Sequence, residues 1–302
     1  MPEPGPHQLL IRVHAAGMNR GELLALHRRG PGTIVPLGME AAGEVVRTGA
    51  DTAPFQAGER VMGRCAAAYS EYALMDARDA MTIPESLSWT QAASLPIATM
   101  VVYDMLVGQG HLAAHEWLLV TGISSGVGVT ALQLAKALDA RVIGTSGSAR
   151  KLRALTRQGL DVGLHTREPD FHEAVMEATQ GHGANLAVNT VGGTVFSECV
   201  RSLALEGRLA LVGYLDGSQE SPLDLGALHA RRLTVFGVSS KQLTPEQRHR
   251  LVQGVVRDVR PLWADGRLVP LIDRTFAWNE LPQAVAYLES DEQLGKVVIS
   301  VG

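Results

Sequence analysis

From residue 116 onward the sequence alternates short apolar runs with helix-length segments, and no other feature constrains the fold as strongly. Continuous apolar runs are typical of strands buried on both faces, as in a parallel sheet covered by helices. We therefore predict an α/β fold with a doubly wound parallel sheet. Its predicted strands are residues 117–121, 141–145, 162–164, 186–189, 208–212 and 233–238. Helical periodicity predicts helices over residues 127–138, 151–158, 171–179 and 245–264.

The chain before residue 90 has the pattern of an all-β domain, because its apolar runs are short and are cut by Gly and Pro. The same pattern returns near the end of the chain, around a helical stretch over residues 281–288. We therefore predict one domain from residues 1–92 and 268–302, and a second domain with the parallel sheet from residues 93–267. The predicted strands of the first domain are residues 9–13, 42–48, 60–62, 72–75, 272–276 and 296–301.

A loop of Gly and Ser, residues 122–128, joins the strand 117–121 to an apolar-faced helix. Glycines here let the backbone approach a pyrophosphate, and the free N–H groups at the start of the helix attract an anion. The literal G-x-G-x-x-G pattern is not met, since Ile123 and Ser125 stand where glycines are expected. A glycine-rich turn without a ligand is the alternative. The predicted phosphate contacts are Ser124, Ser125, Gly126, Val127 and Gly128.

The end of the next strand indicates which dinucleotide would bind. Sites for NAD place an acidic side chain there to bind the ribose 2′-hydroxyl. In this sequence residues 145–151 contain no Asp or Glu, but offer Thr145, Ser146 and Lys151. Hydroxyls and a cation bind a 2′-phosphate, whereas a carboxylate repels it, so the sequence favours NADPH. The alternative for Lys151 is an ordinary exposed residue in the first turn of a helix.

Composition excludes several other classes of protein. A formal net charge of −4 gives no general attraction to nucleic acid or to anionic lipid. The two cysteines, Cys65 and Cys199, form no C-x-x-C pair, so we expect neither a disulfide framework nor a structural zinc site. No apolar run is long enough for a membrane span, and no G-x-S-x-G motif indicates a hydrolase. We therefore expect a cytoplasmic protein.

Several motifs together resemble one family. The loop 121–128 with Gln133-Leu134-Ala135 resembles that of the zinc-independent quinone oxidoreductases of the medium-chain dehydrogenase/reductase superfamily. Further blocks in the family's order are residues 14–19, 37–43, 58–61, 69–73, 191–193 and 295–298. The resemblance implies a GroES-like β-domain beside a Rossmann domain, with the nicotinamide bound between the two.

The resemblance also implies the chemistry. Zinc-using relatives have a Cys near Asn19 and a His at the position of Met39, and a thioether does not suit zinc. We therefore expect no metal, and conjugate hydride transfer from NADPH to a quinone or an α,β-unsaturated carbonyl. The alternatives are an enoyl-thioester reductase of polyketide or fatty-acid type, and a non-catalytic NADPH-binding sensor or structural protein.

The family pattern assigns residues to this site. Asn19, Thr99 and Tyr103 are expected to border the nicotinamide or the substrate. The alternatives are a turn cap for Asn19 and core packing for the other two residues. Some relatives hold the adenosine phosphate with a Tyr where this chain has Thr166. The further expected cofactor contacts are Val191, Gly213, Tyr214, Val238, Ser239 and Lys296, with a packed loop aromatic as the alternative for Tyr214.

The last predicted strand of the sheet, residues 233–238, also suggests an oligomer. An edge strand exposes unpaired backbone groups, and pairing with its copy in a second protomer buries them. We therefore expect a homodimer that binds a small-molecule substrate.

Overall fold

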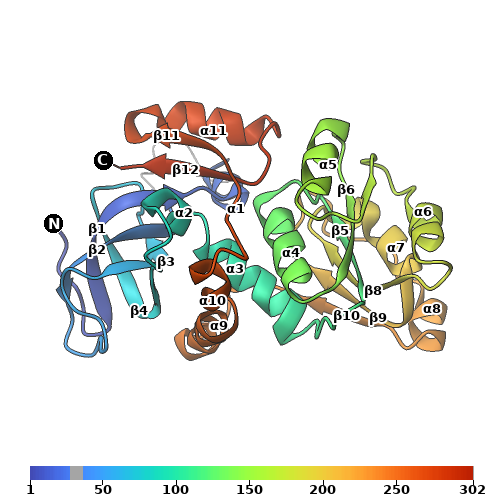
Figure 1. Ribbon diagram of the computed structural model, residues 1–302, viewed down its shortest axis with the longest axis horizontal. Helices are drawn as coiled ribbons and strands as arrows, with labels where there is room; N and C mark the ends of the chain where they lie inside the picture. Colours follow the sequence, from blue (N-terminus) through green and yellow to red (C-terminus); the bar gives the residue numbers. More distant parts are fainter. Residues whose placement is uncertain (28–36, 302) are drawn as a thin grey trace. The chain divides into compact units, whose positions relative to one another are not determined.

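The computed structural model describes residues 1–27 and 37–301, apart from the side chains of residues 24–27. The chain divides into two compact units (Figure 1): unit 1 comprises residues 1–100 and 243–302, and unit 2 comprises residues 101–242. Residues 243–267, which the sequence placed with the parallel sheet, belong to unit 1. The reason is that α9 (Pro245–Asp258) packs on a strand of unit 1, β4 (Tyr72–Thr82).

Unit 2 contains a parallel sheet of six strands in the order β10-β9-β8-β5-β6-β7. The order reverses between β5 and β8, and the carboxyl ends of strands at such a point are where α/β proteins bind ligands. The strands are β5 (Trp117–Thr121), β6 (Arg141–Thr145), β7 (Val162–Leu164), β8 (Ala184–Asn189), β9 (Leu203–Leu211) and β10 (Thr234–Gly237). The first three have the limits that the sequence predicted.

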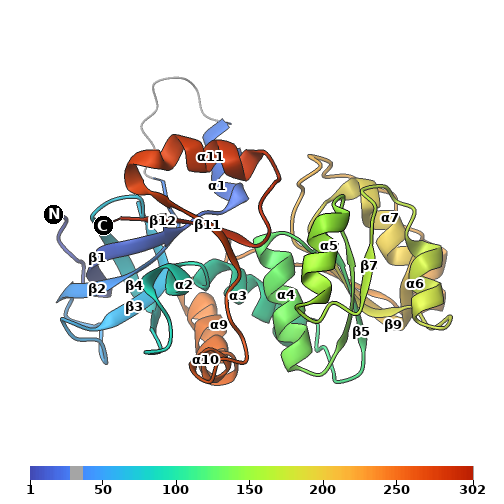
Figure 2. The same ribbon diagram turned by 45° about the horizontal axis from the view of Figure 1, so that its top comes forward.

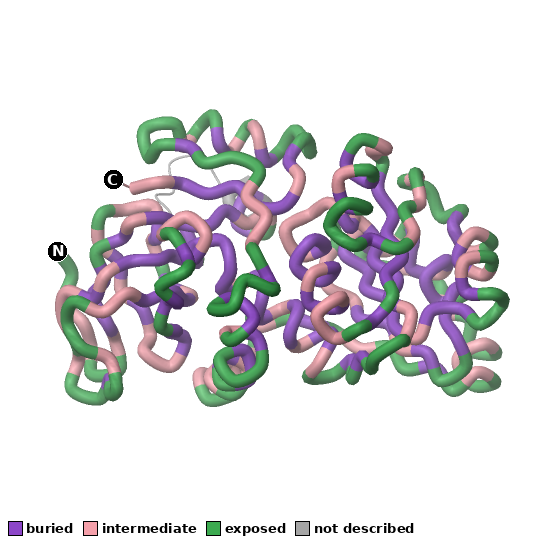
Figure 3. The backbone as a smooth tube through the Cα atoms, viewed as in Figure 1, coloured by how far each residue is buried: buried purple, intermediate pink, exposed green. Residues whose placement is uncertain are grey.

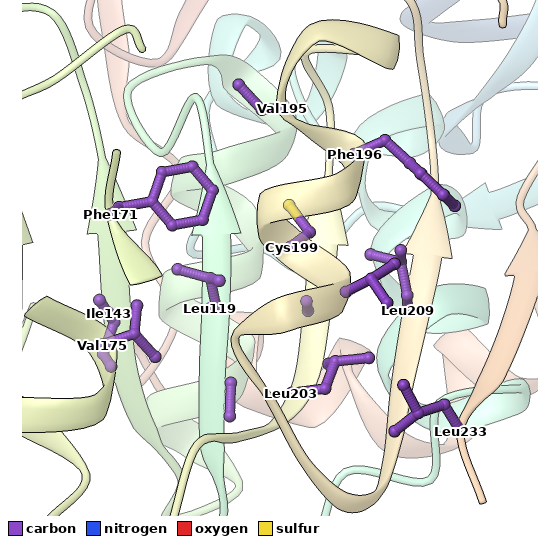
Figure 4. Packing of buried hydrophobic residues seen from close by; sticks show 13 residues of the cluster. Leu119, Ile143, Phe171, Val175, Val195, Phe196, Cys199, Leu203, Leu209 and Leu233 are labelled. Atoms are coloured by element: carbon purple, nitrogen blue, oxygen red, sulfur yellow. The ribbon is translucent and has the colours of Figure 1, made fainter. Parts of the chain in front are cut away.

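Helices cover both faces of this sheet. On one face, α4 (Gly126–Ala137) packs on β5 and β6, and α5 (Ala149–Thr156) packs beside β7. The other face packs against α6 (His172–Ala178) and α7 (Gly193–Arg201), with α8 (Leu225–Ala230) nearby. Figure 4 shows this core, in which Phe171 and Cys199 lie over Leu119. Burial on both faces explains why β5 reads as a continuous apolar run.

Unit 1 is built on a sheet of six strands in the order β11-β12-β1-β2-β3-β4. β1 also pairs with β4, so that the first four strands close into a small barrel, as expected for the GroES-like domain. The strands besides β4 are β1 (Gln8–Gly17), β2 (Glu40–Thr48), β3 (Arg60–Ala66), β11 (Ile272–Ala277) and β12 (Lys296–Ser300). Figure 3 shows long buried stretches of backbone along β1 and β5.

The helices of unit 1 lie around this sheet. α11 (Leu281–Glu289), preceded by a short 3₁₀ turn (Trp278–Glu280), packs on β11 and β12 beside α1 (Arg20–His27) (Figure 2). α2 (Trp89–Ala93) packs on β1 and β2, and α3 (Pro96–Tyr103) continues into a π-helical turn (Asp104–Gly108).

The single helix predicted over residues 245–264 is two helices. α9 ends at Asp258, and α10 (Arg260–Ala264) begins immediately afterwards. Pro261, near the start of α10, has no N–H to donate, and its ring would clash with a carbonyl of the preceding turn. The chain therefore breaks at Val259.

Candidate nucleotide site and a buried polar cluster

The predicted phosphate loop forms a site for an anion. Gly122, with φ of +67°, turns the chain out of β5, and Ser125 caps α4 by accepting a hydrogen bond from Gly128 N at 3.0 Å. No described residue accepts a hydrogen bond from the backbone N–H groups of Ser124, Gly126 or Val127. These donors lie at the positive end of a helix dipole, so the loop offers what a pyrophosphate requires.

Ile123 explains why the glycine pattern is not met. Its side chain is fully buried, and it lies where a Cβ on Gly144 of β6 would come within 2.7 Å of it. A Cβ on Gly128 would lie 2.6 Å from the Ile123 carbonyl oxygen. The close approach of loop, helix and strand is thus provided by Gly128 and Gly144, and an isoleucine fills the space between them.

The loop is tied to the end of β6. Gly122 N donates to Thr145 Oγ1 at 3.3 Å, and Ile123 N donates to Thr145 O at 3.0 Å. Ser124 Oγ lies 3.4 Å from Ser146 Oγ, and Ser146 is buried. The predicted contact residue Thr145 therefore holds the loop in place, while the two serine hydroxyls lie together beside the end of β6.

Two cations lie near this end of the sheet. Lys151 is only 8% exposed, so the alternative of an ordinary surface lysine is wrong. Arg167, which the sequence reasoning missed, follows β7 and lies against Gly147: a Cβ on that glycine would meet Arg167 Nε at 2.1 Å. Because β7 pairs with β6, its carboxyl end lies beside that of β6. A basic residue just after the adjacent strand was the signal available in the sequence.

The other predicted groove residues lie at the ends of β8, β9 and β10. Val191 N donates to Asn189 Oδ1 at 3.0 Å, and Asp216 N donates to Val191 O at 3.0 Å. These bonds tie the segment that carries Gly213 and Tyr214 to the end of β8, and leave the Tyr214 side chain 44% exposed. Val238 is buried and Ser239 is exposed, immediately after β10. Their parts in binding remain predictions.

Unit 1 contains a buried polar cluster formed by Asn19, Glu22, Glu40 and Lys296. Asn19 Nδ2 donates to Glu22 Oε1 at 3.0 Å and to Glu40 Oε1 at 2.8 Å. Lys296 Nζ donates to Asn19 Oδ1 at 2.9 Å, to Glu40 Oε1 at 2.6 Å and to Met18 O at 3.0 Å. These bonds use all three donors of the ammonium group. Lys296, predicted as a cofactor ligand, thus has no donor left for a phosphate and instead orients Asn19.

The cluster contains two carboxyl groups and one ammonium group. The ammonium is bonded to Glu40, whose other oxygen accepts a hydrogen bond from Ile97 N at 2.7 Å, in the first turn of α3. Glu22 has no such cation, although Gly38 N donates to it at 3.0 Å. Burial, with a smaller contribution from the nearby Glu40, raises the pKa of Glu22 from 4.5 to about 7. A buried carboxyl group therefore titrates near neutral pH in this unit.

The three predicted substrate-side residues have distinct surroundings. The amide oxygen of Asn19 faces the Lys296 ammonium instead of capping a turn. Thr99 is 1% exposed, and its hydroxyl has no hydrogen-bond partner among the described residues. An unpaired buried hydroxyl is costly unless a ligand satisfies it. Tyr103 is also buried, so core packing accounts for it as well as a ligand contact does.

Metal-binding clusters and membrane-spanning helices are both absent from the described residues. No group of three or more His, Cys, Asp and Glu side chains there could hold a metal ion. Met39, at the position of the zinc ligand of zinc-using relatives, is 37% exposed. No helix in the same part of the chain is long and apolar enough to cross a membrane. The expected absence of zinc and the cytoplasmic location stay predictions.

Comparison with known proteins adds relatives of two kinds. A family model for the alcohol dehydrogenase GroES-like domain matches residues 5–85, and one for zinc-binding dehydrogenases matches residues 126–255. Quinone oxidoreductase-like protein 2 of Bos taurus is 28% identical over 98% of this chain and 86% of that protein. A phenolphthiocerol/phthiocerol polyketide synthase of Mycobacterium tuberculosis is 28% identical over 99% of this chain, which spans 14% of the synthase. The crystal structure of AibC has a TM-score of 0.87 at 28% identity, covering 99% of this chain and 89% of AibC.

Proposed function

Because the chain belongs to the quinone oxidoreductase-like family of the medium-chain dehydrogenase/reductase superfamily, we propose that it is an NADPH-dependent reductase of quinones or α,β-unsaturated carbonyls. The oxidoreductase class follows from the family, whereas the cofactor and the substrate class are our proposal. The observation that carries it is the phosphate loop, whose free N–H groups at the start of α4 fit a pyrophosphate.

The choice of NADPH over NADH rests on the end of β6. Residues 145–151 contain no carboxylate, and Ser146 lies beside Ser124 there. NADPH, when bound, supplies a hydride from C4 of its nicotinamide ring. The residues of unit 2 hold and orient the dinucleotide, with Ser124 to Gly128 at the pyrophosphate.

In unit 1, we assign opposite roles to Asn19 and Thr99. Both N–H groups of the Asn19 amide are donated to carboxylates, so this side chain has only an acceptor to offer a ligand. Such an acceptor suits an amide N–H donor, such as the carboxamide of nicotinamide. The Thr99 hydroxyl has a free donor, which suits the negative charge that develops on the carbonyl oxygen during hydride addition. Lys296 and Glu40 act through Asn19 as positioning residues.

The test is turnover of the purified protein. With NADPH and a panel of quinones, enals and enones, we expect NADPH oxidation, followed by the loss of absorbance at its reduced-nicotinamide band. Thr99→Val should lower kcat about 10- to 100-fold and leave the Kd for NADPH unchanged, because it removes a donor used only in the transition state. Tight NADPH binding without turnover of any substrate would contradict a reductase and favour a non-catalytic NADPH-binding protein.

A second candidate function is the reduction of enoyl thioesters. The observation that favours it is the match of 99% of the chain to a stretch of a polyketide synthase. Thioester substrates should therefore be assayed beside the free enals and enones. Turnover confined to the thioesters would select this second candidate.

We also propose a homodimer formed through β10. This strand ends the sheet, and Thr234, Val235 and Gly237 are exposed. A second copy related by a twofold axis would continue the sheet by backbone pairing and would cover Val235. Light scattering at micromolar concentration should therefore give twice the mass of the chain, and a monomer would contradict the proposal.

A further inference from the structure

The exposed side chain of Arg167 lies over Gly147, just beyond the carboxyl end of β6. The contact is close, because a Cβ on Gly147 would come within 2.1 Å of Arg167 Nε and within 2.7 Å of Arg167 Cγ. His165 Nε2 lies 3.2 Å from Gly147 O on the same segment. The chain after β7 is thus held against the chain after β6, and the guanidinium group lies one residue away from Ser146.

Arg167 has no hydrogen-bond or ion-pair partner among the described residues, which is unusual beside two acidic neighbours in the sequence. Asp170 is occupied, since its Oδ1 accepts a hydrogen bond from Thr166 Oγ1 at 2.6 Å. Glu168 makes no ion pair with Arg167 within 4.0 Å in the described structure. The five donors of the guanidinium group therefore remain available for a ligand.

The surroundings of Arg167 select a dianionic phosphate monoester as this ligand. A guanidinium group binds two phosphate oxygens at once, which gives both strength and direction. The hydroxyls of Ser124 and Ser146, 3.4 Å apart, add neutral donors at the end of the neighbouring strand. No carboxylate of residues 145–151 opposes a negative charge.

We propose that Arg167 recognises the 2′-phosphate of the adenosine ribose and so determines the preference for NADPH over NADH. This inference rests on the proposed function and adds the residue that sets cofactor specificity. Lys151, at the buried start of α5, is the competing cation. Thr166 is not a competitor, because its hydroxyl is bonded to Asp170.

The role of Arg167 also accounts for Gly147. Any side chain at this position would displace the arginine, although the φ of Gly147 does not require glycine. Gly147→Ala should therefore move Arg167 and act in the same direction as its removal. This gives a second variant that leaves the guanidinium group in the protein.

The experiment measures the Kd of the whole chain for NADPH and for NADH by fluorescence titration. Arg167→Gln should weaken NADPH binding about 10- to 100-fold, the effect of a lost charge-assisted bond to phosphate, and change NADH binding less than about twofold. Adenosine 2′,5′-bisphosphate should weaken in parallel, and 5′-AMP should not. The matched control is Arg157→Gln, because this exposed arginine lies at the opposite end of α5. Circular dichroism checks that each variant is folded.

The possible outcomes separate this inference from the proposed function. If the wild-type protein prefers NADPH and Arg167→Gln keeps that preference, Arg167 is not the determinant and only this inference fails. Equal weakening for both dinucleotides would also overturn it, because Arg167 would then act on the whole cofactor. If the wild-type protein binds NADH as tightly as NADPH, or binds neither, the proposed function fails together with the inference.

Discussion

Glu22 should make the stability of unit 1 fall as the pH rises through neutrality. Burial raises the pKa of this carboxyl group from 4.5 to about 7 in the folded chain. Between these values the folded state holds a proton that the unfolded state has lost, so that the free energy of unfolding decreases with rising pH. Each pH unit is worth about 1.4 kcal/mol, which amounts to about 3 kcal/mol over the whole range. This stabilisation is complete below pH 4.5 and is lost above pH 7.

The perturbation that isolates this effect is Glu22→Gln. The glutamine does not titrate, so the free energy of unfolding of the variant, relative to the wild type, should rise by about 2 to 3 kcal/mol between pH 5 and pH 8. A constant cost is also expected, because an amide nitrogen facing Asn19 Nδ2 or Gly38 N would oppose another donor. Comparing the two pH values removes this constant term.

The assay is urea denaturation followed by tryptophan fluorescence. Trp89, Trp263 and Trp278 lie in unit 1, whereas Trp117 lies in unit 2. A Trp117→Phe background therefore confines the signal to the unit that contains Glu22.

The control for the Glu22 measurement is Glu44→Gln, which removes an accessible carboxylate of β2 that pairs with Arg12 at 3.1 Å. Its effect should stay below about 1 kcal/mol and should not change between the two pH values in the way predicted for Glu22. A Glu22→Gln effect that is the same at pH 5 and at pH 8 would refute the reasoning, because Glu22 would then not titrate between them.

Three further predictions use the same kind of matched comparison. Lys296→Met should lower the free energy of unfolding by about 3 to 5 kcal/mol because it leaves a buried carboxylate without its cation; Lys136→Met, at a half-buried pair of 2.8 Å, should cost about 1 kcal/mol or less in the same denaturation experiment. Equal costs would contradict the role of burial. Gly128→Ala should lose about 1 to 3 kcal/mol and weaken NADPH binding, since its Cβ meets the Ile123 backbone; Gly21→Ala, with open space around it, should do neither in the thermal-shift and titration assays. Val235→Asp should convert the proposed dimer to a monomer in light scattering, and an unchanged mass would exclude β10 as the interface.

The strands of unit 2 could be predicted well because each carries its own evidence. β5, β6 and β8 are buried on both faces, so their residues are apolar without interruption. β4 was harder, since it runs on to Thr82 through the polar residues Asp76, Arg78 and Asp79. Asp79 is tolerated there because Arg248 of α9 lies 3.3 Å from it. A partner 169 positions away leaves no mark on the local pattern.

The phosphate loop is the part of the candidate site that the sequence by itself determined. A strand, a turn and a capped helix follow one another within residues 117–137, so the chain order alone brings the N–H groups together. The lack of a carboxylate after β6 is likewise a local feature, and it was enough to favour NADPH.

Only the tertiary structure decided which side chains act together with these local features. Lys296 and Glu40 are 256 positions apart, and their contact depends on β12 pairing with β1 and β1 pairing with β2. Arg167 lies over Gly147 because β7 pairs with β6. Hydrogen bonds and ion pairs act over a few ångströms whatever the separation in sequence. The sequence therefore determined the elements and the loop, and strand pairing decided which charges meet.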